Sequence, residues 1–493
     1  MTSTGGRAGA HTAGRDGKGP DHSKGRGAGG RGASGDTEPG ATGTPRALAG
    51  EAKGAVEAEL GGPDAAETAR VLSKVLLPTL ARGVLVRRPL MESLVSALEA
   101  DQGIVSTLRD LRERHGDGPL PLRLAGRDAA LVLAADDVRT LLEGTPDPFS
   151  SGGREKRGAL SHFEPHAVLV SEPEERPHRR ASNEQALATG RVLHPDGDAV
   201  AAQADEEARA LLAALGNDGV LDWNRFSASF DALARRVVFG ASAAGDVRTT
   251  ELLRRLRARG NWSYAVPVHR KVRAEFLDRV GRAVDRAEPG SLAAGLSREA
   301  GSHPEDQAAH WLFAFDAAAI AAFRSLALLT SYSPGAHAAR EEIQETEGLD
   351  LPLLRATVLE SVRLWPTTLA VLRESNRETV WGDRVFPAGT AFVVMSAYFH
   401  RDSSRLPYAD EFAPEVWIDG RAEEDPGILP FSYGPAGCAG REVVPLTLSL
   451  FLRSLVRDRD LTRVDARGPL PASGLPASLN HFALRFTLPG RGA

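Results

Sequence analysis

A single cysteine stands in a glycine-rich segment immediately before an apolar run that is typical of a helix. Cys438 is the only cysteine of the chain, and Gly434, Gly437 and Gly440 surround it. Backbone N–H groups and the helix dipole at a helix N-terminus favour the thiolate form of such a residue. Glycines carry no Cβ, so the backbone can bend sharply and approach a flat ligand closely. A lone cysteine is more often an inert core residue, but these glycines favour a thiolate ligand.

The segment from Phe431 to Gly440, FSYGPAGCAG, resembles the cysteine loop of the cytochrome P450 family, whose pattern is Phe-x-x-Gly-x-(Arg/His)-x-Cys-x-Gly. Phe431, Gly434, Cys438 and Gly440 match the pattern. Ala436 departs from it, since the family usually carries there an Arg or His that pairs with a haem propionate. The resemblance implies haem b as cofactor and Cys438 as its iron ligand. The chain has no Cys-x-x-Cys-His motif, so we expect the haem to be held non-covalently.

A second motif lies upstream of the cysteine. Glu360 and Arg363 stand at i and i+3, so they share one helix face. Such a pair is usually a surface ion pair of little energetic value, but its position resembles the Glu-x-x-Arg motif of the family, which interlocks with a later loop. That loop is FAPEVWIDG, residues 412–420, in which Trp417 stands near the family's Arg or Phe positions. We expect Trp417 to pack where a guanidinium would otherwise lie.

Further residues are assigned by the same resemblance. Arg373 corresponds to the propionate-binding Arg on a strand beside the haem, and His178 and Arg179 resemble the basic cluster of a helix that also reaches the propionates. The predicted substrate pocket contains Ala314, Phe315, Thr368 and Leu369, together with the tail 477–486. These mainly apolar side chains predict a small hydrophobic or aromatic substrate, and we expect a role in secondary metabolism.

The long apolar helix predicted over 311–329 departs most from the family pattern. The family commonly has Ala-Gly-x-(Asp/Glu)-Thr there, whereas residues 314–318 read AFDAA. A positioned proton donor typically contributes about 10² to 10⁴ in rate. A substrate hydroxyl or water could relay protons instead, hydrogen peroxide could replace dioxygen, or the reaction could be atypical. Asp316 is the nearest candidate relay; the alternative is a helix carboxylate satisfied by solvent or by Arg324.

The elements that position these residues are mostly helical. Apolar residues three and four apart predict helices within 67–86, 90–115, 206–216, 230–240, 310–332 and 351–365. Short alternating runs at 120–126 and 129–135 predict a small sheet, and 378–398 reads as two strands joined by turns. We therefore expect a mainly α protein with a minor β component, a cytochrome P450 fold in one haem-thiolate domain over 68–493. Residues 1–67 have almost no large apolar side chain, which predicts a disordered extension.

Composition limits the partners. The formal charge is −5, from 60 basic and 65 acidic residues, which gives no reason to expect nucleic acid. No signal peptide or uninterrupted apolar span of membrane length is present, which predicts a cytoplasmic protein without a membrane anchor. No flavin or nicotinamide motif is found, so we expect ferredoxin and ferredoxin reductase to supply electrons to a monooxygenase. Two rivals stay open: a haem-binding protein without turnover, and a cysteine hydrolase, which needs a histidine on the thiolate.

Overall fold

The computed structural model describes residues 62–124, 126–215 and 219–490. Most of the predicted extension 1–67 lies outside the described residues. The first helix, α2 (Ala65–Val71), begins before the predicted domain boundary at residue 68, because Asp64 caps it. The Glu67 N–H donates to Oδ1 of Asp64 over 2.7 Å, and the Asp64 N–H donates to Oε2 of Glu67 over 3.1 Å. This reciprocal capping box satisfies two N–H groups that the helix leaves without an intrahelical partner.

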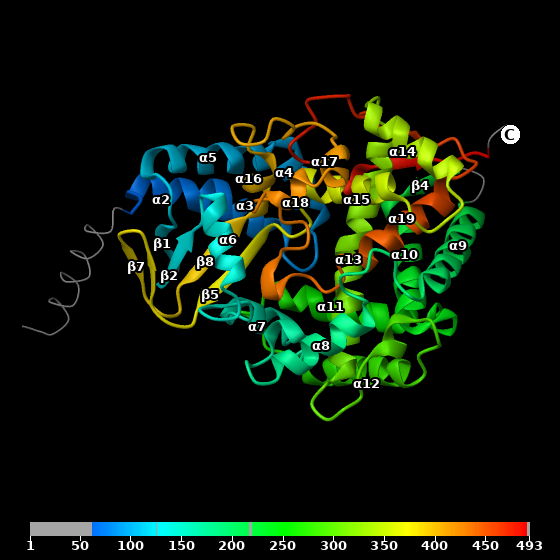
Figure 1. Cartoon of the computed structure of the whole chain (residues 1–493), viewed down its shortest axis with the longest axis horizontal. Helices are drawn as coiled ribbons and strands as arrows, with labels where there is room; N and C mark the ends of the chain where they lie inside the picture. Colours follow the sequence, from blue (N-terminus) through cyan, green and yellow to red (C-terminus); the bar gives the residue numbers. More distant parts are fainter. Residues whose placement is uncertain (1–61, 125, 216–218, 491–493) are drawn as a thin grey trace, which may run out of the picture. The chain divides into compact units, whose positions relative to one another are not determined.

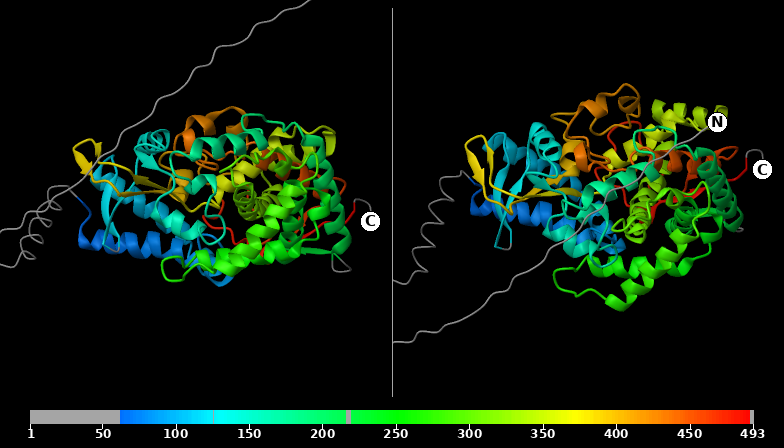
Figure 2. Two further views of the ribbon diagram at one scale, coloured as in Figure 1. Left: turned by 90° about the horizontal axis from the view of Figure 1, so that it is seen from below. Right: turned by 60° about the horizontal axis from the view of Figure 1, so that its bottom comes forward.

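The main sheet and the hairpin of residues 379–386 lie at one end of the folded part (Figures 1 and 2). The main sheet has the order β1-β2-β8-β5-β3, with β1 (Leu120–Leu124), β2 (Arg127–Leu131), β3 (Phe149–Ser150), β5 (Ala370–Ser375) and β8 (Ala391–Met395). Its pairs are antiparallel except β2 with β8. The run 378–398 forms three strands instead of the predicted two, because β6 (Thr379–Trp381) and β7 (Arg384–Phe386) make their own hairpin before the chain enters β8.

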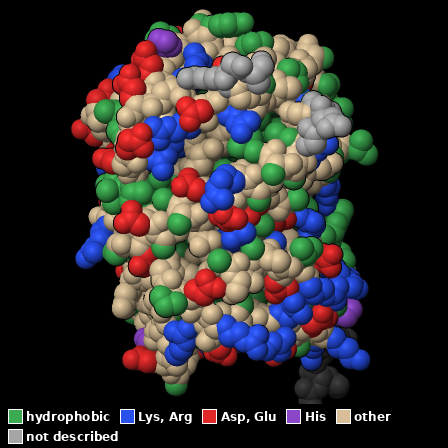
Figure 3. Space-filling view, turned by 90° about the vertical axis from the view of Figure 1, so that its right-hand side faces the viewer, with side chains coloured by type: hydrophobic (Ala, Val, Ile, Leu, Met, Phe, Trp, Pro, Cys, Tyr) green, Lys and Arg blue, Asp and Glu red, His purple; other side chains and the backbone are tan. Residues whose placement is uncertain are grey.

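The other end is helical. The helices enclose one hydrophobic core, and the main sheet with its neighbouring helices encloses another. A small sheet, β4 (Val220–Asp222), β10 (Arg485–Thr487) and β9 (Thr462–Arg463), closes the chain against it. The face-on view of this end shows Lys and Arg side chains beside Asp and Glu side chains (Figure 3). The helices after α2 are α3 (Leu77–Arg82), α4 (Pro89–Ala97), α5 (Ala100–His115), α6 (Ala135–Glu143), α7 (Arg154–Leu160), α8 (Arg176–Ala186), α9 (Gly197–Ala214), α10 (Trp223–Phe239), α11 (Val247–Gly260), α12 (Arg270–Asp285), α13 (Pro304–Leu329), α14 (Pro334–Glu345), α15 (Pro352–Leu364), α16 (Ser396–Arg401), α17 (Glu415–Ile418), α18 (Arg421–Glu424) and α19 (Val443–Val456).

Helix α13 is the central element. It is long and apolar enough to cross a membrane by composition, yet 78% of its apolar window is buried inside the protein. A helix that is apolar on nearly all sides is expected in the core of a large protein. It packs against α10, α12 and α15, and it therefore connects the helical core with the elements that carry the predicted site.

Candidate functional site

The cysteine loop, residues 431–440, has a fixed backbone. The Cys438 N–H donates to the Phe431 carbonyl over 2.9 Å, and the Gly437 N–H donates to the Gly434 carbonyl over 2.9 Å. Gly434 has φ of +70°, and a Cβ built there would lie 2.5 Å from the Leu142 carbonyl oxygen of α6. Both the left-handed backbone and the close approach require glycine. Gly434 therefore fits the loop against α6, and the loop delivers Cys438 to the start of α19.

The Cys438 thiol is free, and the residue is half-buried. Burial raises its pKa, while the Gly440 N–H and the positive charge of Arg180 oppose that rise. Without a ligand, desolvation outweighs these two contributions to the pKa of Cys438. A metal cation would reverse this balance, since a coordinating thiol loses its proton. No described histidine hydrogen-bonds to Cys438, and His400 instead accepts the Leu429 N–H over 2.8 Å, so the hydrolase alternative has no support.

Helix α8 presents arginines to the cysteine loop, but not the residues expected from the sequence. Arg176 donates to the Pro435 carbonyl over 3.3 Å, and Arg180 donates to the Gly437 carbonyl over 2.5 Å. Arg179 is turned away and donates to the Gly301 carbonyl, and His178 lies 3.8 Å from a Glu299 carboxylate oxygen. Arg176 and Arg180 stand at i and i+4 on one helix face. The predicted basic helix is thus present, with a different face toward the loop.

Three basic side chains lie beside the loop, and in the described part of the chain no carboxylate forms an ion pair with them. We call Lys156, Arg176 and Arg373 the cation cluster. Desolvation and then Arg373 and Arg176 lower the pKa of Lys156 to about 7, and desolvation with Arg176 lowers the pKa of Arg373 to about 10. Buried charges are normally paired, so this cluster would suit the two propionates of the haem that the resemblance implies, with Cys438 as the expected iron ligand.

The side chain of Arg373 is fixed in position beside the loop. It lies on β5 and is 3% exposed, and its Nε donates to Thr145 Oγ1 over 2.9 Å. Lys156, on α7, donates to the neighbouring Leu372 carbonyl over 3.2 Å. Arg373 lies on a strand, as the resemblance to the cytochrome P450 family implies. Lys156 and Arg176 were not predicted, because they come near the loop only in the folded chain. The spacing of Arg176 and Arg180 at i and i+4 on α8 was the one feature of the sequence that could have indicated their common orientation toward the loop.

The Glu360–Arg363 pair is fully buried, with both side chains 0% exposed. Arg363 Nε donates to Glu360 Oε1 over 2.6 Å, and its other nitrogens donate to carbonyls of residues 400, 408, 409 and 411. The Trp417 Nε1–H donates to the same Glu360 oxygen over 2.8 Å. The indole is therefore a hydrogen-bond donor to Glu360, and the interlock joins α15 to the segment that precedes the cysteine loop.

On α13, two predicted residues point away from the loop. Asp316 forms an ion pair with Arg257 of α11 over 2.6 Å, and not with Arg324. Phe315 is buried against Phe230 of α10, with ring centroids 6.2 Å apart, so it belongs to the core and not to a pocket. Helical phase explains both, because residues 315 and 316 face α10 and α11. Asp316 is thus engaged in a structural ion pair.

One side of α13 is nevertheless accessible. Between residues 306 and 329 only His310, Phe313, Ala314, Asp316 and Ala317 are not buried. We call the stripe of 310, 314 and 317 the open side of α13. Helix α8, which contacts the cysteine loop, also holds α13, because the Trp311 Nε1–H donates to Asn183 over 2.8 Å. Ala314 is half-buried on the open side of α13, and its place in a substrate pocket stays a prediction.

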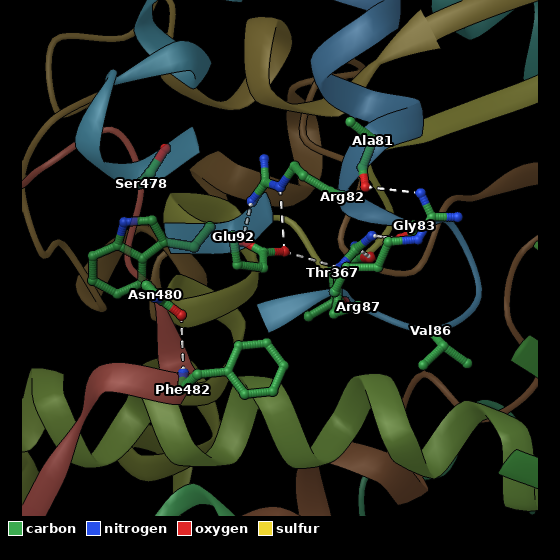
Figure 4. A network of polar contacts seen from close by, with 12 residues as sticks. Ala81, Arg82, Gly83, Val86, Arg87, Glu92, Thr367, Ser478, Asn480 and Phe482 are labelled. Atoms are coloured by element: carbon green, nitrogen blue, oxygen red, sulfur yellow. Dashed lines mark hydrogen bonds and ion pairs between the residues drawn. The ribbon is translucent and has the colours of Figure 1, made fainter. Parts of the chain in front are cut away.

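The remaining predicted pocket residues lie at the start of β5. Thr368 is exposed and Leu369 is half-buried. The segment between α3 and α4 lies over this region and over α13 (Figure 4). Arg87 donates to the Thr367 carbonyl, and Arg82 forms an ion pair with Glu92 over 3.1 Å. This segment thus ties the N-terminal helices to the edge of the site.

Comparison with known proteins agrees with this geometry. The sequence profile of the family described as Cytochrome P450 matches residues 325–479. The chain is 31% identical over 119 residues to the probable cytochrome P450 12c1, mitochondrial, of Drosophila melanogaster (22% of this chain, 23% of that protein). It is 31% identical over 134 residues to the mitochondrial sterol 26-hydroxylase of Mus musculus (25% of each). The match thus spans about a quarter of the length of these relatives.

Solved structures share the fold over a larger part of the chain. The retinoic acid-bound cyanobacterial CYP120A1 superposes with a TM-score of 0.60 at 19% identity, covering 78% of this chain and 93% of that one. CYP175A1 from Thermus thermophilus superposes with a TM-score of 0.58 at 21% identity, covering 80% of this chain and 98% of that one. The profile match over residues 325–479 and the curated relatives support membership of the cytochrome P450 superfamily, whose members carry haem, and the solved structures show that the chain has the fold of that superfamily.

Proposed function

We propose that the chain is a haem-thiolate monooxygenase that inserts one oxygen atom into a small hydrophobic or aromatic substrate. The observation that carries the proposal is the cation cluster beside Cys438. A non-covalent haem b needs an axial ligand for iron and partners for two propionates. Cys438 supplies the first, and Lys156, Arg176 and Arg373, none of which forms an ion pair with a carboxylate among the described residues, supply the second.

The residues of the chain then have distinct tasks. When bound, haem supplies oxygen activation, for which a thiolate ligand favours O–O cleavage. The Gly440 N–H interacts with the sulfur of Cys438, and such contacts to a ligating sulfur tune its electron density. The interlock around Glu360 holds the chain leading to the loop. Small side chains at Ala314 and Ala317 leave room on the open side of α13, which supports an apolar substrate of modest size.

Electrons have to come from another protein, because the sequence has no flavin or nicotinamide motif. Members of this superfamily take electrons from redox partners, and we propose a ferredoxin with its reductase for this chain. A cytoplasmic location and a role in secondary metabolism are further predictions from the sequence. The absence of the usual acid and alcohol at residues 317 and 318 keeps a peroxide-driven reaction as the alternative chemistry.

The first test is the difference spectrum of the dithionite-reduced protein with and without carbon monoxide, recorded for the wild type and for Cys438→Ser. We expect a thiolate-type Soret band that is lost in the variant. A histidine-type band, or a protein that binds no haem, would refute the ligand assignment. Product formation from a substrate panel is then measured with dioxygen plus ferredoxin and reductase, and separately with hydrogen peroxide. If no product forms under either condition, the result would favour a haem-binding protein without turnover.

A further inference from the structure

Helix α13 lacks the carboxyl–hydroxyl pair at its centre, but its first turns carry a row of titratable side chains. His303, Asp306 and His310 stand at i, i+3 and i+7, so they follow one face of the helix. That face continues into the open side of α13 through Ala314 and Ala317. The row therefore begins at the helix N-terminus and ends beside the proposed pocket.

The inner end of the row is a histidine held by a buried carboxylate. His310 Nδ1 lies 2.8 Å from Oε1 of Glu164, whose side chain is 0% exposed, whereas His310 is 24% exposed. Desolvation lowers the pKa of His310, but the charge and hydrogen bond of Glu164 outweigh it, and the pKa is raised overall. No described residue hydrogen-bonds to Nε2 of His310. A proton on Nε2 is therefore available to a group on the open side of α13.

Two carboxylate oxygens behind His310 are buried without partners in the described part of the chain. They are Oε2 of Glu164 and Oδ2 of Asp306. Desolvation raises the pKa of Glu164, and it raises the pKa of Asp306 to about 7, with Glu305 and Glu164 adding to the rise. The His166 N–H fixes the other oxygen of Asp306 over 2.8 Å. Unpaired buried oxygens of this kind are where a shared proton or a bridging water is expected.

The outer end of the row reaches solvent. His166 is exposed, and its ring stacks on that of His303 with centroids 4.1 Å apart. His303 Nδ1 also lies 3.3 Å from an oxygen of Glu305. Imidazoles exchange protons readily near neutral pH. Protons can therefore enter the row from bulk water at the end that lies farthest from the open side.

We propose that Asp306, Glu164 and His310 form a proton relay from solvent to the open side of α13, in place of the missing carboxyl–hydroxyl pair. The relay rests on the proposed function, since a monooxygenase consumes protons at this place. One proton leaves Nε2 of His310 for an oxygen acceptor in the pocket, and one proton enters from solvent through Asp306. No electron moves, and the charge of the row is restored after each transfer.

The charged neighbours of the row come from four elements. Lys156 of α7 faces His310, and Arg257 of α11 faces Glu164. Arg179 of α8 and Glu305 of α13 itself face Asp306. Lys156 also belongs to the cation cluster, which places His310 within electrostatic range of the site. Lys156 is therefore next to both the relay and the proposed propionate site.

The relay is tested with Glu164→Gln, Asp306→Asn and His310→Gln, each close in size to the native side chain. His337→Gln is the matched control, because His337 also contacts a carboxylate, Glu341, over 3.1 Å, but on the exposed surface of α14. NADPH-dependent dioxygen consumption by the haem-loaded full chain is measured with ferredoxin and ferredoxin reductase as electron donors, in water and in deuterium oxide, and the rate without the chain is subtracted. We expect each relay variant to lose about 10² or more in rate, with an altered solvent isotope effect, while His337→Gln stays at the wild-type rate.

A second readout is independent of turnover. Infrared difference spectra across pH should show the carbonyl band of a protonated carboxyl group that titrates near neutral pH and disappears in Asp306→Asn or Glu164→Gln. Wild-type rates and isotope effects in all three variants, or a carboxyl band that neither carboxyl variant changes, would overturn the relay. If His310→Gln does not fold, His310→Asn replaces it. The carbon monoxide spectrum of each variant separates the two proposals, because a retained thiolate band leaves the proposed function intact.

Discussion

The indole of Trp417 is expected to stabilise the fold through one hydrogen bond to a buried carboxylate. Its Nε1–H donates to Glu360 over 2.8 Å, and Glu360 shares that oxygen with Arg363 at 2.6 Å. A hydrogen bond to a charged group contributes about 1.5 to 3 kcal/mol. Trp417→Phe keeps most of the ring packing and removes the donor, so we expect the free energy of unfolding to fall by about 2 kcal/mol.

Urea unfolding followed by far-ultraviolet circular dichroism measures this change. Trp262→Phe is the control, because that ring is 46% exposed, lies under the Arg88 guanidinium and should change stability by less than about 0.5 kcal/mol. Glu360→Gln should cost more than Trp417→Phe, about 3 to 5 kcal/mol, because it leaves the Arg363 charge buried without its partner. A Trp417→Phe value equal to the control would refute the hydrogen-bond reasoning.

Three further predictions concern the cysteine loop and the cation cluster. Gly434→Ala should weaken haem binding and lower the thermal unfolding temperature, because its Cβ would lie 2.5 Å from the Leu142 carbonyl oxygen. Gly468→Ala is the control in the thermal unfolding assay, because Gly468 has φ of +64° but open space around it, so this variant shows the effect of backbone strain without the clash. Arg176→Gln should speed haem transfer to apomyoglobin, while Arg377→Gln, in an exposed ion pair, should not. Lys156 has a pKa lowered from 10.5 to about 7, so the unfolded chain binds more protons between these values, and the stability of the haem-free protein should rise with pH there. Urea unfolding of Lys156→Met should show a smaller rise, and an unchanged rise would contradict this assignment.

The sequence was sufficient for those parts of the site that depend on local spacing. The cysteine loop could be predicted because its glycines and Cys438 act within ten residues of one another. Glu360 and Arg363 could be predicted because a spacing of three puts them on one helix face. The mainly α fold class is also confirmed, since long amphipathic runs determine it. In each case the residues that act together lie within one short segment of the chain.

The roles of residues that are determined by helix phase or by tertiary packing could not be predicted from the sequence. His178 and Arg179 lie on the helix expected to bind the propionates, but a rotation of one or two residues puts Arg176 and Arg180 toward the loop instead. Asp316 was singled out because it is the acid nearest to the expected position on α13. The partner that engages it, Arg257, comes from α11 and is 59 residues away in sequence. Periodicity gives no information on which face of a fully buried helix meets which neighbour.

The departures from the family pattern are better understood by counting charges than by matching residues. Ala436 removes a cation from the cysteine loop, and Arg176 of α8 donates to the carbonyl of the residue before it. Trp417 replaces a cation next to Glu360 with a neutral donor, and the buried pair with Arg363 then has no net charge while each carboxylate oxygen keeps its donors. A burial of this kind is tolerated only when charge and hydrogen bonds are both satisfied. Around α13, Arg257 matches the charge of Asp316, whereas Glu164 and Asp306 each retain a buried oxygen without a partner among the described residues.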